Sequence, residues 1–176
     1  AVSLQIFSDR DAVDTLDNLL RQSLHDQALS DVPLGAFLSG GVDSSTVVGI
    51  LQSMSTRPVK TFTIGFDQAD FNEASEAADV AKYLGTDHVE LIVSAEDALA
   101  VINQLPIMYD EPFADASQVP TFLVSQLAKK EVTVCLSGDG GDELFCGYNR
   151  YHYTAKVWSR LKKIPFPIRK ILSVFL

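Results

Sequence analysis

Apolar positions along this chain follow two alternating patterns, one typical of amphipathic helices and one typical of buried strands. The first helical pattern covers residues 11–28, where apolar side chains recur three or four positions apart at Val13, Leu16, Leu19, Leu20 and Leu24. The same spacing predicts further helices over residues 43–54, 72–84, 95–104 and 117–130. Short apolar runs predict strands over residues 34–38, 59–66, 86–93 and 132–136.

Strands that alternate with helices of this length predict an α/β fold, a doubly wound parallel sheet with helices on both faces. In such sheets, ligands bind beyond the carboxyl ends of the strands. Three segments fall at such ends, namely residues 39–45, 65–66 and 137–142. We therefore expect these segments to meet in one shared site.

The composition fits one packed domain, because 47% of the 176 residues are hydrophobic. The apolar runs are too short to span a bilayer, and the first residues do not resemble a signal peptide. Cys135 and Cys146 form no C-x-x-C pair and fit no metal-ligand spacing. These features lead us to expect free thiols and a location in the reducing cytoplasm.

The net charge of −9 is unevenly distributed. All 23 acidic residues and 7 basic ones lie before residue 144, and the other 7 basic residues follow it. The basic segment 156–176 fits either an amphipathic helix on a membrane or partner, or a helix that packs on further chain. Pro165 and Pro167 interrupt that helix, which favours the second interpretation. We expect a core domain over residues 1–155, with 156–176 as its truncated continuation, and neither a nucleic-acid nor a membrane partner.

A local signal marks one helix start. Ser94 stands at an N-cap position and Asp97 follows it three residues later, which predicts a capping box at the start of the helix 95–104.

The segment 37–45 reads Phe-Leu-Ser-Gly-Gly-Val-Asp-Ser-Ser and joins a predicted strand to a predicted helix. Gly40 and Gly41 allow the backbone to approach a phosphate chain at a helix N-terminus, and hydroxyl donors are supplied by Ser39, Ser44 and Ser45. No Lys follows the glycines, so the segment is not a G-x-x-x-x-G-K-[ST] loop. Asp43 fits either a Mg²⁺ ligand beside the phosphates or an N-cap in a tight turn.

A second glycine-rich turn follows the last predicted strand and reads Ser-Gly-Asp-Gly-Gly-Asp-Glu over residues 137–143. Ser137 and Gly138 offer donors, and the negative charges of Asp139, Asp142 and Glu143 favour a bound cation. The alternative is a solvated acidic loop, but the apolar residues 144–145 favour partial burial. The turn lacks the ligand pattern of an EF-hand calcium loop. Asp43 and Asp142 together suit a Mg²⁺–pyrophosphate clamp.

These motifs carry a resemblance to known families. Residues 39–44 resemble the pyrophosphate loop of the N-type ATP pyrophosphatases, which cleave ATP to AMP and pyrophosphate. Residues 137–148 resemble the second signature of the glutamine-dependent asparagine synthetases, as do residues 84–88 and 110–115. The resemblance covers residues 8–155 and implies a Rossmann-like ATP pyrophosphatase fold. It also implies an ATP- and Mg²⁺-dependent ligase that adenylylates the side-chain carboxylate of aspartate for attack by ammonia, giving asparagine.

The resemblance also implies roles for individual residues. The ATP site would consist of Leu38, Ser39, Gly40, Gly41, Asp43, Ser44, Ser45, Ile64, Glu73, Ser137 and Gly138. Asp43 and Asp142 would hold Mg²⁺. Asp139, where many members have Glu, and Tyr148 would take catalytic positions. Asp115 and Ser117 would border the pocket for the substrate.

Three departures limit what the resemblance implies. The chain starts at Ala1 and lacks the N-terminal Cys nucleophile of the family's glutaminase domain. A phosphate-contacting Lys from a later region is missing, and Cys146 replaces a common Gly. We therefore expect an excised synthetase domain that receives ammonia from a glutaminase domain absent here, with a homodimer in the full-length protein.

Two other functions remain open at this point. One is the same activation step on another carboxylate, as in β-lactam synthetases or amidotransferases of surface-polysaccharide pathways. The other is a non-catalytic nucleotide-binding module, although that class is expected to lose its Mg²⁺ carboxylates, and both are present.

Overall fold

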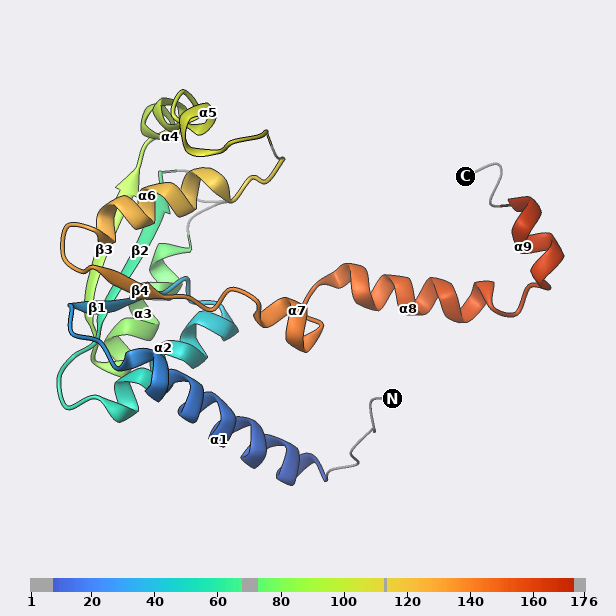
Figure 1. Ribbon diagram of the computed structural model, residues 1–176, viewed down its shortest axis with the longest axis horizontal. Coiled ribbons are helices and arrows are strands. Elements are labelled where there is room, and N and C mark those ends of the chain that lie inside the picture. Colours follow the sequence, from blue (N-terminus) through green and yellow to red (C-terminus); the bar gives the residue numbers. More distant parts are fainter. Residues whose placement is uncertain (1–7, 68–72, 113, 173–176) are drawn as a thin grey trace. The chain divides into compact units, whose positions relative to one another are not determined.

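A computed structural model describes residues 8–67, 73–112 and 114–172 of the chain (Figure 1). The chain divides into two compact units, Ala1–Gly138 and Asp139–Leu176. This division lies after Gly138 and not after residue 155, where the sequence predicted the end of the core domain. The boundary after residue 155 stays a prediction.

The first unit is built on a parallel sheet of four strands, β1 (Leu34–Phe37), β2 (Lys60–Phe66), β3 (Asp87–Val93) and β4 (Val134–Leu136). Their order across the sheet is β3-β2-β1-β4. The chain winds outward from β1 to β3 and then returns to place β4 on the other side of β1. The strand order therefore reverses between β1 and β4, and this is the point at which such sheets bind ligands.

Helices cover both faces of this sheet (Figure 1). They are α1 (Asp9–Ala28), α2 (Val42–Met54), α3 (Ala74–Leu84), α4 (Ala95–Ile102), α5 (Leu105–Met108) and α6 (Gln118–Ala128). On one face, α1, α2 and α3 share a core with β1, in which Val48 packs with Ala36. On the other face, α6 packs on Phe62 of β2 and, together with α4, on Val93 of β3. The predicted doubly wound α/β fold is confirmed.

Each strand and long helix predicted for this unit is present, and no predicted end differs from the observed one by more than two residues. The capping box is confirmed, since the backbone N–H of Asp97 donates to Ser94 Oγ at 3.1 Å and the N–H of Ser94 donates to Asp97 Oδ2 at 3.0 Å. β4 begins two residues later than expected, because the N–H of Val132 bonds to Ala128 O at the end of α6. The single turn α5 was not predicted, because one turn offers no periodicity.

The second unit contains α7 (Gly141–Phe145), α8 (Asn149–Leu161) and α9 (Phe166–Leu172). The helix is interrupted as predicted, since α8 ends at Leu161 and α9 begins at Phe166 after Pro165, but Pro167 lies in the first turn of α9, where a proline is tolerated. The expected partial burial of the acidic turn holds for Gly138, Gly141 and Asp142, which are half-buried, but the apolar residues that follow the turn are not buried. Leu144 is 78% exposed and Phe145 55% exposed, because they lie on a helix too short to bury one face. Across the described residues, no helix is both long and apolar enough to cross a membrane.

Candidate functional site

The first glycine-rich turn ends at the N-terminus of α2, where Gly41 is the N-cap residue. Gly41 has no side chain, so the first N–H groups of α2 receive no side-chain cap. Gly40 adopts φ 77° and packs against the start of α3, where a Cβ would lie 2.8 Å from the Cβ of Glu76 and 3.0 Å from the N of Ala77. Only glycine fits there, and a helix N-terminus without a side-chain cap suits an anion.

Two of the predicted phosphate ligands are held together within this turn. The hydroxyls of Ser39 and Ser44 lie 2.9 Å apart, and Ser44 Oγ also accepts the backbone N–H of Ser39 at 3.2 Å. Ser39 Oγ accepts the N–H of Gly41 at 3.3 Å. These bonds fix the shape of the loop before any ligand binds, which lowers the ordering cost of binding.

The second glycine-rich turn meets the first. A Cβ on Gly138 would lie 2.8 Å from the backbone N of Ser44 and 3.0 Å from the carbonyl carbon of Asp43. The φ of Gly138 is not positive, so glycine is required by this close approach and not by backbone conformation. The carboxyl ends of β1 and β4 therefore lie together where the strand order reverses. The sequence predicted that segment 39–45 and residues 137–138 would meet, and this contact confirms it.

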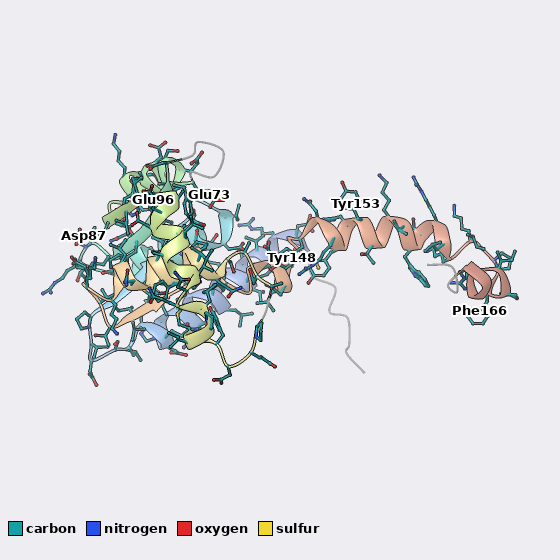
Figure 2. All side chains as sticks on the ribbon, turned by 90° about the horizontal axis from the view of Figure 1, so that it is seen from above. Glu73, Asp87, Glu96, Tyr148, Tyr153 and Phe166 are labelled. Atoms are coloured by element: carbon teal, nitrogen blue, oxygen red, sulfur yellow. The ribbon has the colours of Figure 1, made fainter. Side chains whose placement is uncertain are left out.

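Other predicted ATP ligands lie around this junction. Leu38 is 1% exposed and its N–H donates to Phe62 O at 3.0 Å, so its side chain belongs to the core. Ile64 is partly buried against the second-face core. Glu73 is the exposed N-cap residue of α3, the helix on which Gly40 packs (Figure 2). Contacts of Leu38, Ile64 and Glu73 with a nucleotide stay predictions.

Ser45 lies on another surface of α2. It lines an apolar groove of about 340 Å³ between α1 and α2, together with Val13, Leu16 and Ile50. Its buried hydroxyl has no hydrogen-bond partner among the residues that the structure describes. A contact between Ser45 and a phosphate stays a prediction.

The metal prediction rests on carboxylates in both units. Asp43 lies in the first turn of α2, where the helix dipole also favours a negative charge, and Asp142 lies in the first turn of α7. Within the described ranges, no three His, Cys, Asp or Glu side chains converge, so the acidic turn 139–143 is not a protein-only metal cage. Mg²⁺ takes few protein ligands and completes its shell with phosphate oxygens and water, and a Mg²⁺ site at Asp43 and Asp142 stays a prediction.

The predicted border of the substrate pocket forms a small turn before α6. Asp115 Oδ1 accepts the N–H of Ser117 at 2.8 Å and its hydroxyl at 2.7 Å, and these bonds lower the pKa of the Asp115 carboxyl. Nearby, a cleft of about 290 Å³ is lined by Leu105, Pro106, Tyr109, Asp110, Glu111, Pro112 and Gln118. Sequence reasoning singled out the Asp-Glu-Pro run but missed Tyr109 and Gln118, which carry no motif of their own.

In the second unit, Tyr148 is the N-cap residue of α8. Its hydroxyl donates to Glu143 Oε1 at 2.6 Å, and this bond is the main reason why the pKa of Tyr148 is raised to about 12. The guanidinium carbon of Arg150 lies 4.0 Å from the centre of the Tyr148 ring. Asp139 opens this unit, four residues before Glu143. Arg150 was not predicted, because its contact depends on the turn between α7 and α8.

The strand order, the glycine turn at the start of α2 and the glycine at the end of β4 define a doubly wound α/β protein with a glycine-lined helix N-terminus at the strand reversal. Solved structures with this fold include a glutamine-dependent NAD⁺ synthetase from Acinetobacter baumannii (TM-score 0.56, 20% identity, 84% of this chain and 29% of that one). Another is an NMN synthetase from Francisella tularensis (TM-score 0.51, 16% identity, 81% and 59%). The asparagine synthase family model matches residues 15–175, and the chain belongs to this family.

Sequence similarity to curated asparagine synthetases supports the family membership. The chain is 37% identical over 163 residues to asparagine synthetase [glutamine-hydrolyzing] 1 of Bacillus subtilis, covering 90% of the chain and 26% of that protein. It is 32% identical to asparagine synthetase B [glutamine-hydrolyzing] of Escherichia coli, covering 82% and 30%. The chain spans about a quarter to a third of the length of the curated relatives it matches.

Proposed function

We propose that this chain is the ATP-binding synthetase part of an asparagine synthetase that uses ammonia released from glutamine. In this proposal it binds Mg-ATP, transfers the AMP group to the side-chain carboxylate of aspartate and releases pyrophosphate. Ammonia from a separate glutaminase domain then completes the amide. A homodimer of the full-length protein belongs to the same proposal.

The observation that carries the proposal is the contact of Gly138 with the backbone of Ser44. It joins the two turns that resemble the family's signatures, and it does so where the strand order reverses. Hydroxyls of Ser39 and Ser44 and the N-terminus of α2 lie at the same place. Donors without a side-chain cap, a glycine lining and a helix dipole together favour a phosphate chain over a neutral ligand.

In the proposed reaction, these donors hold the pyrophosphate end of ATP. Asp43 and Asp142 are the proposed Mg²⁺ ligands, and the ion would supply positive charge to the leaving pyrophosphate. A carboxylate oxygen of aspartate forms a bond to the α-phosphorus while the bond from that phosphorus to the bridging oxygen breaks. The nitrogen of ammonia next attacks the activated carbonyl carbon, loses a proton and displaces AMP. In this proposal, the first unit lowers the activation barrier for AMP transfer by holding the pyrophosphate leaving group in place.

The substrate end of the site is proposed from the family resemblance. Asp139 and Tyr148 are assigned to the amino-acid substrate and its activated carboxylate. Asp115 and Ser117 are assigned to the border of the pocket. The hydrogen bonds that fix Asp115 keep its carboxylate ionised, which suits recognition of an ammonium group.

Calorimetric titration of this chain with ATP, with and without Mg²⁺ and with GTP as control, tests the first step. We expect Mg²⁺-dependent binding that favours ATP over GTP. Aspartate-dependent exchange between ATP and pyrophosphate, measured on a protein that also contains the regions present in the relatives, tests the transfer step. Exchange supported by another carboxylate and not by aspartate would replace the substrate assignment, and no binding of ATP by a folded sample would refute the site.

A further inference from the structure

Three side chains of the second unit form a connected cluster, which we call the tyrosine clip: Glu143, Tyr148 and Arg150. Tyr148 donates its hydroxyl to Glu143 at 2.6 Å. The Arg150 guanidinium lies 4.0 Å from the centre of the Tyr148 ring, on the attractive π-face, and 5.6 Å from the ring of Tyr151. The clip therefore ties the first turn of α8 to α7 through one hydrogen bond and one cation–π contact.

The clip closes over the short connection between α7 and α8. In that connection, the N–H of Gly147 donates to the backbone carbonyl of Asp142 at 3.0 Å. A Cβ on Gly147 would overlap the Oδ1 atom of Asp142. The carboxylate of Asp142 thus lies directly against the segment that the clip holds, so movement of α8 relative to α7 is transmitted to this carboxylate.

The charge of Arg150 also stabilises its position beside Glu143. Asp142 and Glu143 are adjacent acids in the first turn of the five-residue helix α7. Like charges this close repel each other, and the Arg150 cation opposes that repulsion at Glu143. The Tyr148 hydroxyl donates to the Glu143 carboxylate, so the arginine and the tyrosine both stabilise the negative charge of this carboxylate.

We propose that Arg150 is a positioning residue that holds Tyr148 on Glu143 and thereby fixes α7 and the carboxylate of Asp142. The consequence for Mg-ATP rests on the proposed function, in which Asp142 is a metal ligand. The positioning itself does not, because it concerns contacts within the second unit alone.

The test compares Arg150→Ala and Arg150→Lys with Lys156→Ala. Lys156 is an exposed cation on the same helix that makes no ion pair or ring contact within the described part of the chain, so its removal controls for net charge. Amide hydrogen exchange is measured over residues 141–147. We expect Arg150→Ala to raise exchange there about 2- to 5-fold, the range given by an exposed cation–π contact. Arg150→Lys keeps the charge without the planar group and is expected to recover part of the protection.

The same variants are titrated with Mg-ATP and with metal-free AMP. Arg150→Ala is expected to weaken Mg-ATP binding about 2- to 5-fold and to leave AMP binding unchanged. Equal exchange in Arg150→Ala and Lys156→Ala would overturn the positioning role, and equal weakening of both ligands would overturn its consequence for Mg-ATP. If the unmodified chain binds no Mg-ATP while the exchange at 141–147 responds to Arg150 alone, the proposed function fails and the positioning role stands.

Discussion

Replacing Gly138 with alanine tests whether the close approach of the two glycine turns creates the binding site. The added Cβ would lie 2.8 Å from Ser44 N, 3.0 Å from the carbonyl carbon of Asp43 and 3.1 Å from Ser44 Cα. Ordinary contacts of a Cβ begin at 3.4 Å, so the turns must separate by about 0.6 Å. All three atoms belong to the backbone, and no side-chain rotation can relieve the overlap.

Overpacking of this kind costs about 1–3 kcal/mol. If the cost is expressed as displacement of the turn from the start of α2, it corresponds to roughly 5- to 150-fold weaker binding of Mg-ATP. We expect calorimetry to find a loss of affinity for Mg-ATP in this range. The part of the overpacking cost that does not weaken binding is expected to lower the stability of the first unit, measured by chemical denaturation followed by circular dichroism.

Gly49→Ala is the matched control. It adds the same methyl group to α2, but its nearest neighbour would be Leu84 Cδ2 at 3.8 Å. In a helix interior this change stabilises by about 0.5–1 kcal/mol, so the control is expected to keep its affinity for ATP. Wild-type affinity and stability in Gly138→Ala, or an equal loss of affinity in Gly49→Ala, would refute the reasoning.

Three further predictions concern the metal, the backbone and pH. Asp43→Asn is expected to weaken Mg-ATP binding about 10- to 100-fold and to leave binding of metal-free AMP unchanged, by calorimetry; parallel losses would exclude Asp43 as a metal ligand. Cys146 adopts φ 58° and ψ 37°, so Cys146→Gly is expected to raise the free energy of unfolding of the second unit by about 0.5–1 kcal/mol. Fluorescence of the chain's single tryptophan on α8 reports this unfolding, and an equal gain in Cys146→Ala would show that the thiol and not the backbone is responsible. Burial lowers the pKa of His88, which is hydrogen-bonded to Thr61, and a nearby acid, Glu90, opposes this shift only in part. The unfolded chain therefore binds the proton more readily, so this contribution to stability is full above about pH 6.5 and is lost as the pH falls below it. Denaturation at pH 7.5 and 5.5 is expected to show a steeper loss in the wild type than in His88→Gln, and equal losses would contradict this assignment.

Periodicity made the elements of the first unit predictable. Helix α3 buries Ala74, Ala77 and Ala81, which recur three and four positions apart, and strand β2 is buried along most of its length, and both patterns are visible in the sequence. The strand order is not visible there, because it depends on where β4 returns to the sheet. What could be predicted was that glycine turns at the ends of parallel strands would lie at one edge, and the contact of Gly138 with Ser44 confirms this.

Contacts that depend on the path of a short turn could not be predicted. Arg150 carries no motif, and its position over Tyr148 follows from the left-handed backbone of Cys146 between α7 and α8. Leu38 shows the reverse case. Its motif position indicated a ligand contact, whereas its side chain completes the core, because successive residues leaving a strand point to opposite faces.

The strand order also determines when this site can exist during folding. Gly35 pairs with Lys60 of β2 on one side and with Cys135 of β4 on the other, so the second pairing joins residues four times as far apart along the chain. Closing the longer loop costs about 1.2 kcal/mol more in chain entropy, and pairings of high sequence separation form slowly. We expect β1, β2 and β3 to associate first. The two turns can meet only after β4 has docked, so a chain emerging from the ribosome gains its affinity for nucleotide after Gly138 has been synthesised and released from the exit tunnel.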